Sequence, residues 1–320
     1  MTARMRTYEP DRDFLRIRDF LNETYSAFPS PYNWGLERWN YARHFVSPMI
    51  GAYGTDQNNI EGELKAIALW ENFVRVWEDD DGNIGGVTCI EHPDSTLDNF
   101  GEIFVQRHPE HSDLLEEMIA FSEEHYLSPK KNRVYTWVYD DDADLIAVVK
   151  ARGFERRDEP VSHHLEYAFG EFPKLELPDG FRLLSMAEEN DIDKRREIFG
   201  RGFNHEEEKE WPSAYSYREL QKAPDYHKEL DLFIVAPDGT YAACCIVWYD
   251  EVNHVGHLEP LGTHPDFRRK GLATQIQYEG MRRLQELGAT HMPMTGGFEP
   301  FYRAIGFEEK QTQRPWVKQF

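Results

Sequence analysis

The sequence is poor in cysteine. Only Cys89, Cys244 and Cys245 occur among 320 residues, and no Cys-x-x-C is present. A disulfide framework or a structural zinc site needs more cysteines at defined spacings, so both are disfavoured. Cys244 and Cys245 lie inside an apolar run, where free cysteine packs as a small hydrophobic residue. We therefore expect all three to be core residues.

The histidines do not compensate for this shortage of metal ligands. The pairs His108/His111 and His163/His164 lack a ligand spacing, and the sequence offers them no obvious carboxylate partners. We expect no metal site.

Long hydrophobic runs are absent as well. A membrane-spanning helix needs about 18 or more consecutive apolar residues, and no stretch approaches this length. The opening residues MTARMRTYEPDRDF carry positive charges without the apolar segment of a secretory signal. We expect a soluble, cytoplasmic protein without a membrane partner.

Positive charge is also scarce. The chain has 36 Lys and Arg against 58 Asp and Glu, a formal net charge of -22. Binding to nucleic acid requires clustered basic residues, so this partner class is disfavoured. The negative field would attract a basic or amine-bearing substrate, although such a charge also serves solubility alone.

An internal repeat is the main feature that the sequence does contain. Three signatures recur in the same order, roughly 155 residues apart, as expected for a duplicated domain. They are Asp81-Gly82 and Asp238-Gly239 before apolar runs, His108-Pro109-Glu110 and His264-Pro265-Asp266 before amphipathic segments, and residues 151–155 and 304–308 around Gly-Phe-Glu.

A segment rich in proline and glycine, residues 170–180, separates the two copies. We place the boundary near Phe172 and predict an N-terminal domain over residues 1–171 and a C-terminal domain over residues 172–320. Domains of this size are common, and 40% hydrophobic residues supply a core for each.

Each copy shows the same order of strands and helices. A first strand leads into helical sequence, then a hairpin, a further strand, a helix, another strand, a helix that ends at Gly153 or Gly306, and a closing strand. We expect a mixed α/β fold, with a central mixed β-sheet flanked by helices in each copy. The expected strands are 5–8, 84–90, 100–107, 134–139, 181–184, 241–248, 254–264 and 291–295, with helices over 112–126 and 271–287.

The loop after the strand at 254–264 has the features of an anion site. Residues Arg268, Arg269 and Lys270 precede Gly271 at the start of a clear helix. Free N–H groups of a first helical turn bind phosphate, the helix dipole favours negative charge, and glycine allows close approach of the backbone. Neither a P-loop nor a dinucleotide-binding motif is present.

Two segments resemble the GNAT superfamily of acetyltransferases. Arg268-x-x-Gly271-x-Ala273 resembles the family's [Q/R]-x-x-G-x-[G/A] acyl-CoA motif, and residues 301–308 resemble its Y-x-x-x-G-F segment. The resemblance covers residues 231–309 well, and the N-terminal copy only through the repeat. The tandem arrangement is similar to that of mycothiol-synthase-like members.

The resemblance implies acetyl-CoA as the cofactor. Backbone amides of the loop would hold the pyrophosphate, and the pantetheine arm would pair with the strand before it, like an added strand. The implied cofactor-binding residues are Leu261, Gly262, Thr263, Arg268, Arg269, Lys270, Gly271, Leu272, Ala273 and Thr274.

The resemblance also implies catalytic roles. Tyr302 stands where the family's tyrosine donates a proton to the leaving thiolate, although it could simply pack under the sheet. A base for the acceptor amine often comes from the cofactor strand. Glu259 is our first choice and His257, two residues away on the same face, is the alternative. Glu259 could also be a solvated carboxylate.

The sequence departs from the family pattern at two places. Pro260 interrupts the cofactor strand, which requires an unpaired or bulged position there. The asparagine usually found before the last helix is missing, and Gly296, Gly297 and Phe298 occupy its region.

The N-terminal copy has lost the loop. Alignment of the repeat places Ser112 against Arg268 and Leu115 against Gly271, and the acidic Asp113, Glu116 and Glu117 would repel pyrophosphate. We expect one CoA per chain, with this copy forming a wall of the substrate cleft or only stabilising its partner. Aromatic residues that could line an amine pocket or pack in a core are Tyr25, Phe28, Tyr32, Trp34, Trp39, Tyr41, Phe45, Phe199, Phe203, Trp211, Tyr215 and Tyr217.

The leading interpretation is an enzyme that acetylates a small-molecule amine by direct attack on acetyl-CoA. The alternatives are a non-catalytic acyl-CoA-binding sensor and a protein or peptide N-acetyltransferase. No motif identifies the acceptor or the oligomeric state.

Overall fold

The computed structural model describes residues 3–28, 32–52 and 59–320. Its strands are β1 (Arg4–Thr7), β2 (Arg75–Glu78), β3 (Ile84–Cys89), β4 (Phe104–Arg107), β5 (Arg133–Tyr139), β6 (Glu155–Arg156), β7 (Ser162–Ala168), β8 (Arg182–Ser185), β9 (Asp231–Val235), β10 (Tyr241–Asp250), β11 (Val255–Thr263), β12 (His291–Thr295) and β13 (Glu308–Gln319). Its α-helices are α1 (Pro10–Tyr25), α2 (Leu36–Tyr41), α3 (Ser47–Ala52), α4 (Ile60–Phe73), α5 (Leu115–His125), α6 (Ala143–Ala151), α7 (Ile192–Gly202), α8 (Ala214–Leu220), α9 (Leu272–Leu287) and α10 (Glu299–Ala304). The expected mixed α/β architecture is confirmed.

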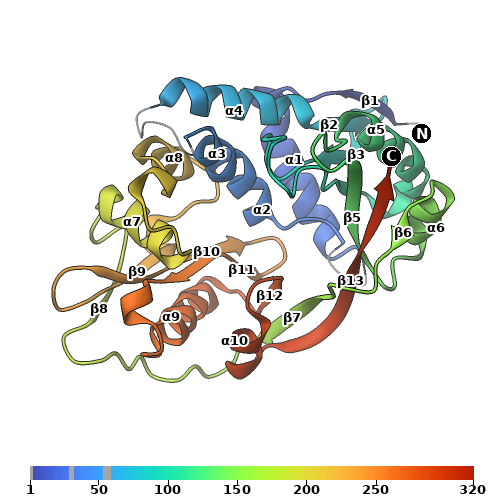
Figure 1. Cartoon of the computed structure of the whole chain (residues 1–320). Helices are drawn as coiled ribbons and strands as arrows, with labels where there is room; N and C mark the ends of the chain where they lie inside the picture. The colour runs from blue at the N-terminus through green and yellow to red at the C-terminus, as the bar shows by residue number, and fades with distance from the viewer. Residues whose placement is uncertain (1–2, 29–31, 53–58) are drawn as a thin grey trace.

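The strands form two sheets, and the second contains strands of both copies. Strands β1 to β4 make one sheet, and a second runs in the order β5-β13-β7-β12-β11-β10-β9-β8, with β6 beside β13. Strand β7 of the first copy lies between β12 and β13, while the distal part of β13 pairs with β5 of the first copy. Figure 1 shows β13 running from the α10 side of the molecule to the β5 side. The two copies therefore exchange their closing strands.

In each copy, two neighbouring parallel strands pair at one position only and then separate. In the second copy the parallel strands β11 and β12 pair only at Val255 and His291 and then diverge. In the first copy the corresponding contact is the single parallel bridge between Glu102 and Tyr135. The backbone edge of β11 beyond Val255 is thus left open on the side of β12.

The repeat is also visible in local geometry. The Nδ1 atoms of His108 and His264 each accept a hydrogen bond at 3.2 Å, from the N–H of Glu110 and of Asp266 respectively. The glycines of both Asp-Gly turns and of both helix ends, namely Gly82, Gly239, Gly153 and Gly306, have positive φ, the conformation that favours glycine.

Aromatic and aliphatic residues hold the two copies together. The ring of Phe45 lies 5.0 Å from that of Phe199, and Tyr41 and Phe45 share a buried cluster with Tyr217 and Trp248. Trp39 is buried in the core of the first copy. This part of the aromatic segment therefore packs instead of lining a pocket.

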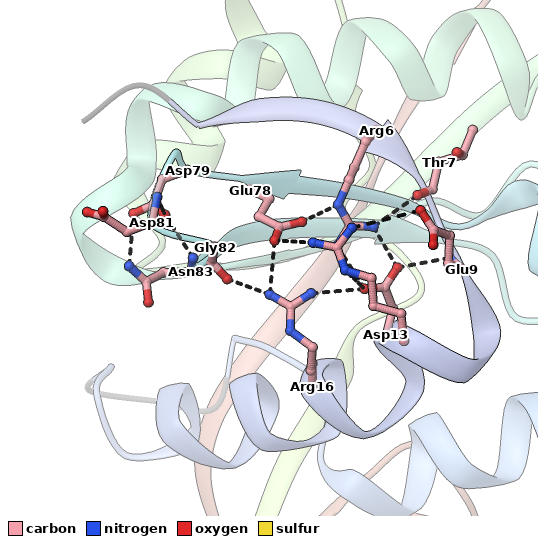
Figure 2. Close-up of polar contacts among 11 residues, drawn as sticks. Arg6, Thr7, Glu9, Asp13, Arg16, Glu78, Asp79, Asp81, Gly82 and Asn83 are labelled. Carbon is pink, nitrogen blue, oxygen red and sulfur yellow. Dashed lines mark hydrogen bonds and ion pairs between the residues drawn. The ribbon is translucent and has the colours of Figure 1, made fainter.

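A polar network anchors the start of the chain to the first sheet (Figure 2). Asp13 on α1 accepts two hydrogen bonds from Arg6 on β1, at 2.6 and 2.7 Å. Arg16 on α1 donates to Glu78 on β2 at 3.2 Å and to the carbonyl of Gly82 in the Asp-Gly turn. These contacts fix α1 across the hairpin, and α1 leads into the segment that reaches the second copy.

Three further expectations can be compared with the described residues. Cys89, Cys244 and Cys245 are free and buried, as expected. No helix in the described ranges is long and apolar enough to cross a bilayer. Residues 169–181 contain no helix or strand and connect β7 to β8, so the division near Phe172 remains our prediction for the domain boundary.

Candidate active site

A cavity of 540 Å³ lies between the two copies. The second copy contributes three consecutive residues of β11, residues 293–297 at the end of β12 and directly after it, and Gln313 of β13. The first copy contributes the α1–α2 segment, the β4 region, β5 and β7. The lining side chains with polar or aromatic groups include Tyr25, Tyr32, Trp34, Glu37, Arg38, Glu102, Arg107, Tyr139, His164, His257 and Glu259. The first copy thus forms a wall of the cavity, one of the two roles considered for it.

The loop before α9 has the geometry of an anion site. Gly271 has φ +77 and precedes the first residue of the helix, and Arg269 has φ +62. A Cβ on Gly271 would meet no atom within 4 Å, so the space in front of the first turn is open. Because the first four N–H groups of a helix lack intrahelical partners, those of this turn can donate to a bound anion.

Arg268 holds the loop in place. Its guanidinium donates to the carbonyl of Thr263 at 3.1 Å, to the carbonyl of Gly202 at 3.2 Å and to Asn204 Oδ1 at 2.7 Å. Arg269 and Lys270 are exposed beside it. Arg268 therefore ties the end of β11 to the end of α7, while its neighbours remain available to an anion.

Strand β11 is bulged where Pro260 stands. Cys245 pairs with Leu261 and Val247 with Leu258, so β11 contains one more residue than β10 across this interval. The indole N–H of Trp248 donates to the carbonyl of Glu259 at 3.0 Å, which satisfies a group that the ladder leaves free. The bulge that the sequence required at Pro260 is confirmed.

Beyond the bulge, Leu261, Gly262 and Thr263 pair with β10 on one side. Their other edge faces the opening toward β12, since β12 pairs with β11 only at Val255. An extended chain of amide groups would find free backbone partners there.

Glu259 lies in the cavity wall with its side chain 29% exposed. Arg38 Nη1 donates to its Oε2 at 3.1 Å, and the same guanidinium also pairs with Glu91. Burial raises the pKa of the Glu259 carboxyl, and the Arg38 guanidinium opposes this rise.

His257 lies on the same strand and is 3% exposed. Its Nδ1 is 3.1 Å from Glu37 Oε2, and its Nε2 is buried without a partner among the described residues. Burial lowers the pKa of the imidazole to about 4.

Tyr302 lies on α10 with 7% exposure, packed in the core of the second copy. A Cβ on Gly297 would lie 3.0 Å from its ring and 3.7 Å from its hydroxyl oxygen, and Gly297 lines the cavity. Burial, with Cys245 and Glu259 nearby, raises the pKa of Tyr302, so the phenol keeps its proton at neutral pH. Tyr302 therefore packs under the sheet next to Gly297, which lines the cavity.

The corresponding loop of the first copy has a different shape. A short helical segment, Pro109–Leu114, runs directly into α5, and Leu114 before α5 is in the right-handed helical region. Ser112 Oγ donates to Asp144 at 2.7 Å. No residue in this loop has the positive φ found at Gly271, so the loop lacks the backbone shape seen before α9, and the absence of CoA binding by this copy stays a prediction.

One expectation about the histidines is wrong. His163 does have carboxylate neighbours, because the exchange of strands brings β7 next to β13: its Nδ1 lies 2.9 Å from Glu309 and its Nε2 3.6 Å from Glu299. These three residues form a group with the spacing of metal ligands. Arg303 pairs with both glutamates and already supplies them with a positive charge.

The sequence did not reveal the residues that the first copy brings to β11. Burial raises the pKa of both Glu37 and Glu102 to about 7. The aromatic segment was a partial signal, since Tyr25, Tyr32 and Trp34 do line the cavity. No local sequence pattern identified the charged residues of that segment as residues that line the cavity.

Comparison with known proteins agrees with this arrangement. Residues 196–311 match the model of the acetyltransferase (GNAT) family. A comparison with curated protein sequences gave no match. Among solved structures, a tandem GNAT protein from the clavulanic acid biosynthesis pathway is similar over 99% of this chain and 98% of its own, with 13% identity and a TM-score of 0.63.

Two other structures show the same fold over the whole chain. A GCN5-related N-acetyltransferase from Sphaerobacter thermophilus has 14% identity and a TM-score of 0.56, covering 99% of this chain and 95% of its own. The N-myristoyltransferase of Saccharomyces cerevisiae, with bound myristoyl-CoA, has 11% identity and a TM-score of 0.54, covering 99% of this chain and 79% of its own. Residues 196–311 therefore match the GNAT acetyltransferase family, and the whole chain has the fold of tandem, two-domain GNAT proteins.

Proposed function

We propose that the protein is an N-acetyltransferase that transfers the acetyl group of acetyl-CoA to an amine of a small molecule by direct attack. The observation that carries this proposal is the position of the cavity. It borders the open region of β11 and brings the candidate proton-transfer groups His257 and Glu259 into one wall.

In this proposal the anion-binding loop before α9 holds the pyrophosphate of the cofactor. Amides of residues 269–274 supply donors, and Leu261 to Thr263 pair with the pantetheine arm. The thioester then lies near the bulge at Glu259 and Pro260. Tyr302, protonated and close to Gly297, donates a proton to the departing thiolate.

The acceptor is proposed to be a cation before reaction. The carboxylates Glu37, Glu102 and Glu259 line the cavity together with Arg38, which pairs with one of them. An alkylammonium group is attracted to such a lining and must lose a proton before it can attack. A residue of β11, Glu259 or His257, accepts that proton.

The enclosure of the cavity by both copies favours a small molecule over a protein tail. A non-catalytic sensor would need the loop but neither Tyr302 nor a base in the cavity wall.

Thiol release from acetyl-CoA, measured across a panel of amines, aminoglycosides and peptides, tests the proposal. Turnover of a small amine supports it. Turnover of peptides alone supports the protein-directed alternative, and CoA binding without turnover of any panel member supports a sensor.

A further inference from the structure

Two consecutive residues of the first copy reach the cofactor strand of the second. Glu37 and Arg38, at the start of α2, contact His257 and Glu259 respectively. Neighbouring side chains of one helix thus meet alternate side chains of one strand. The two contacts differ in kind, because one joins a carboxylate to an imidazole and the other joins a guanidinium to a carboxylate.

The contact between Glu37 and His257 leaves one ring nitrogen free for chemistry. Glu37 Oε2 lies 3.1 Å from Nδ1 without forming a hydrogen bond to it, and Nε2 is buried, has no hydrogen-bond partner among the described residues and belongs to a residue that lines the cavity. A small rotation of either side chain forms an Nδ1–H···carboxylate hydrogen bond over this distance, and a histidine in such a bond carries its lone pair on Nε2. That bonded arrangement orients an imidazole as a proton acceptor.

The surroundings are shaped to bring the two groups together. A Cβ on Gly35 would lie 2.2 Å from Glu37 Oε2 and 2.7 Å from His257 Cε1, so only glycine leaves room for both side chains. The ring of Tyr25 packs edge-on against the imidazole at 5.7 Å. The first copy therefore supplies the carboxylate, the space for it and one wall of the ring.

We infer that Glu37 is a positioning residue which orients His257, and that His257 Nε2 is the proton acceptor for the amine. The inference rests on the proposed function and deepens it. It assigns the proton-accepting role to His257 instead of Glu259, our first choice from sequence. The carboxylate of Glu259 is already engaged by Arg38, whereas Nε2 is unoccupied.

The reaction then balances as follows. One proton of the ammonium group passes to His257 Nε2, and the freed lone pair forms the C–N bond to the thioester carbonyl carbon. The C–S bond breaks, and its electron pair leaves on sulfur. The thiolate takes a proton from Tyr302, which regains one from the nitrogen of the new amide. His257 releases its proton to solvent, so each turnover yields amide, CoA thiol and one proton.

The charges around the ring set the order in which the pair titrates. Burial raises the pKa of Glu37 to about 7 and lowers that of His257 to about 4, so Glu37 takes up a proton first as the pH falls. A protonated Glu37 that donates to Nδ1 leaves the ring as the Nε2–H tautomer. The other titratable and charged groups facing the pair from neighbouring elements are Tyr25, Arg38, His164, Asp250, Glu259 and His291.

Nuclear magnetic resonance of the full-length chain with ¹⁵N-labelled histidine tests the positioning role without any acceptor. His257→Ala assigns the signals. At pH 8.5 we expect His257 as the Nδ1–H tautomer, with Nε2 bare, and a change to Nε2–H below pH 7. In Glu37→Ala the preference for Nδ1–H should disappear, and Glu37→Asp should restore part of it. Glu23→Gln, on the exposed face of α1, is the control. An Nε2–H tautomer in the wild type at pH 8.5, or an unchanged tautomer in Glu37→Ala, overturns the inference.

Kinetics with acetyl-CoA and the panel amine that the wild type acetylates fastest give a second measurement. His257→Ala should lower kcat by about 10²–10⁴-fold, the range of general base catalysis, with an unchanged KM for acetyl-CoA. Glu37→Gln should lower kcat by about tenfold or more and alter the acidic limb of the pH profile. If kcat and the pH profile are unchanged in both variants, the inference fails although the enzyme is active. If no panel amine reacts with the wild type, the proposed function fails while the tautomer measurement still decides the role of Glu37.

Discussion

Arg38 Nη1 lies 3.1 Å from Glu259 Oε2, an ion pair between residues 221 positions apart in the sequence. It links helix α2 of the first copy to strand β11 of the second. The same guanidinium contacts Glu91, so one arginine holds two carboxylates, of which Glu259 lines the cavity. The ionisation of Glu259 therefore depends on an arginine of the first copy.

Replacement of Arg38 should change the ionisation of Glu259. Burial raises the pKa of this carboxyl and Arg38 lowers it, so Arg38→Gln should raise the pKa further and reduce the ionised fraction at pH 6. Carbon-13 NMR of the labelled Glu259 carboxyl measures this. Arg43→Gln, which removes an ion pair to Glu71 away from the cavity lining, is the control. An unchanged titration in Arg38→Gln would contradict the assigned electrostatics.

Gly271→Glu should greatly weaken CoA binding, because the new carboxylate enters the open space before α9 and repels pyrophosphate. Gly239→Glu is a matched control. Gly239 also has positive φ and no atom within 4 Å of its Cβ position, but it lies in the β9–β10 turn. Both variants carry the same backbone strain, so only Gly271→Glu should lose affinity. Calorimetry should give one CoA per wild-type chain, and two equivalent sites would refute the assignment to the second copy.

Tyr302→Phe removes a hydroxyl and keeps the ring that packs under the sheet. If Tyr302 protonates the thiolate, turnover should fall by about 10²–10⁴-fold while CoA affinity stays nearly constant. Steady-state kinetics and CoA titration on the same preparation separate the two quantities. A change of only about twofold would assign Tyr302 to packing alone.

Glu102→Gln should stabilise the protein at alkaline pH. Burial raises the folded-state pKa of Glu102 to about 7, so its charged form is less favourable in the folded chain than in the unfolded one. The stability associated with this group is full below about pH 4.5 and is lost as the pH rises through 7. The variant should gain about 1–3 kcal/mol in free energy of unfolding at pH 8.5 and little at pH 4.5.

Urea denaturation at the two pH values measures this difference. The gain should depend on burial, so the exposed Glu124→Gln should show none. An equal gain at both pH values would mean that Glu102 acts through packing and not through its charge.

The sequence predicted much of the fold because the signals involved are local. Gly82, Gly239, Gly153 and Gly306 stand at turns and helix ends, where positive φ is needed. The apolar runs after the Asp-Gly turns located β3 and β10, with boundaries within two residues of those in the structure. The bulge at Pro260 could be predicted because proline has no N–H to donate to a neighbouring strand.

The contacts between the two copies could not be predicted in this way. Glu37 and Arg38 belong to a segment that reads as helical surface, and their role depends on which strand of the other copy lies opposite. The neighbours of His163 were missed for the same reason, since Glu309 reaches it only through the exchange of β7 and β13. Contacts between segments far apart in the sequence produce no periodic pattern in either segment.

The exchanged strands also govern how this molecule is made and how it comes apart. β13 is synthesised after every other described strand, yet it is the strand to which β5 of the first copy is paired. The edge of β5 in the first copy therefore stays unpaired during translation until β13 has been synthesised. A protease that cut once within residues 170–180 would not release two independent domains, because one fragment would retain β7 inside the other's sheet and receive β13 in return.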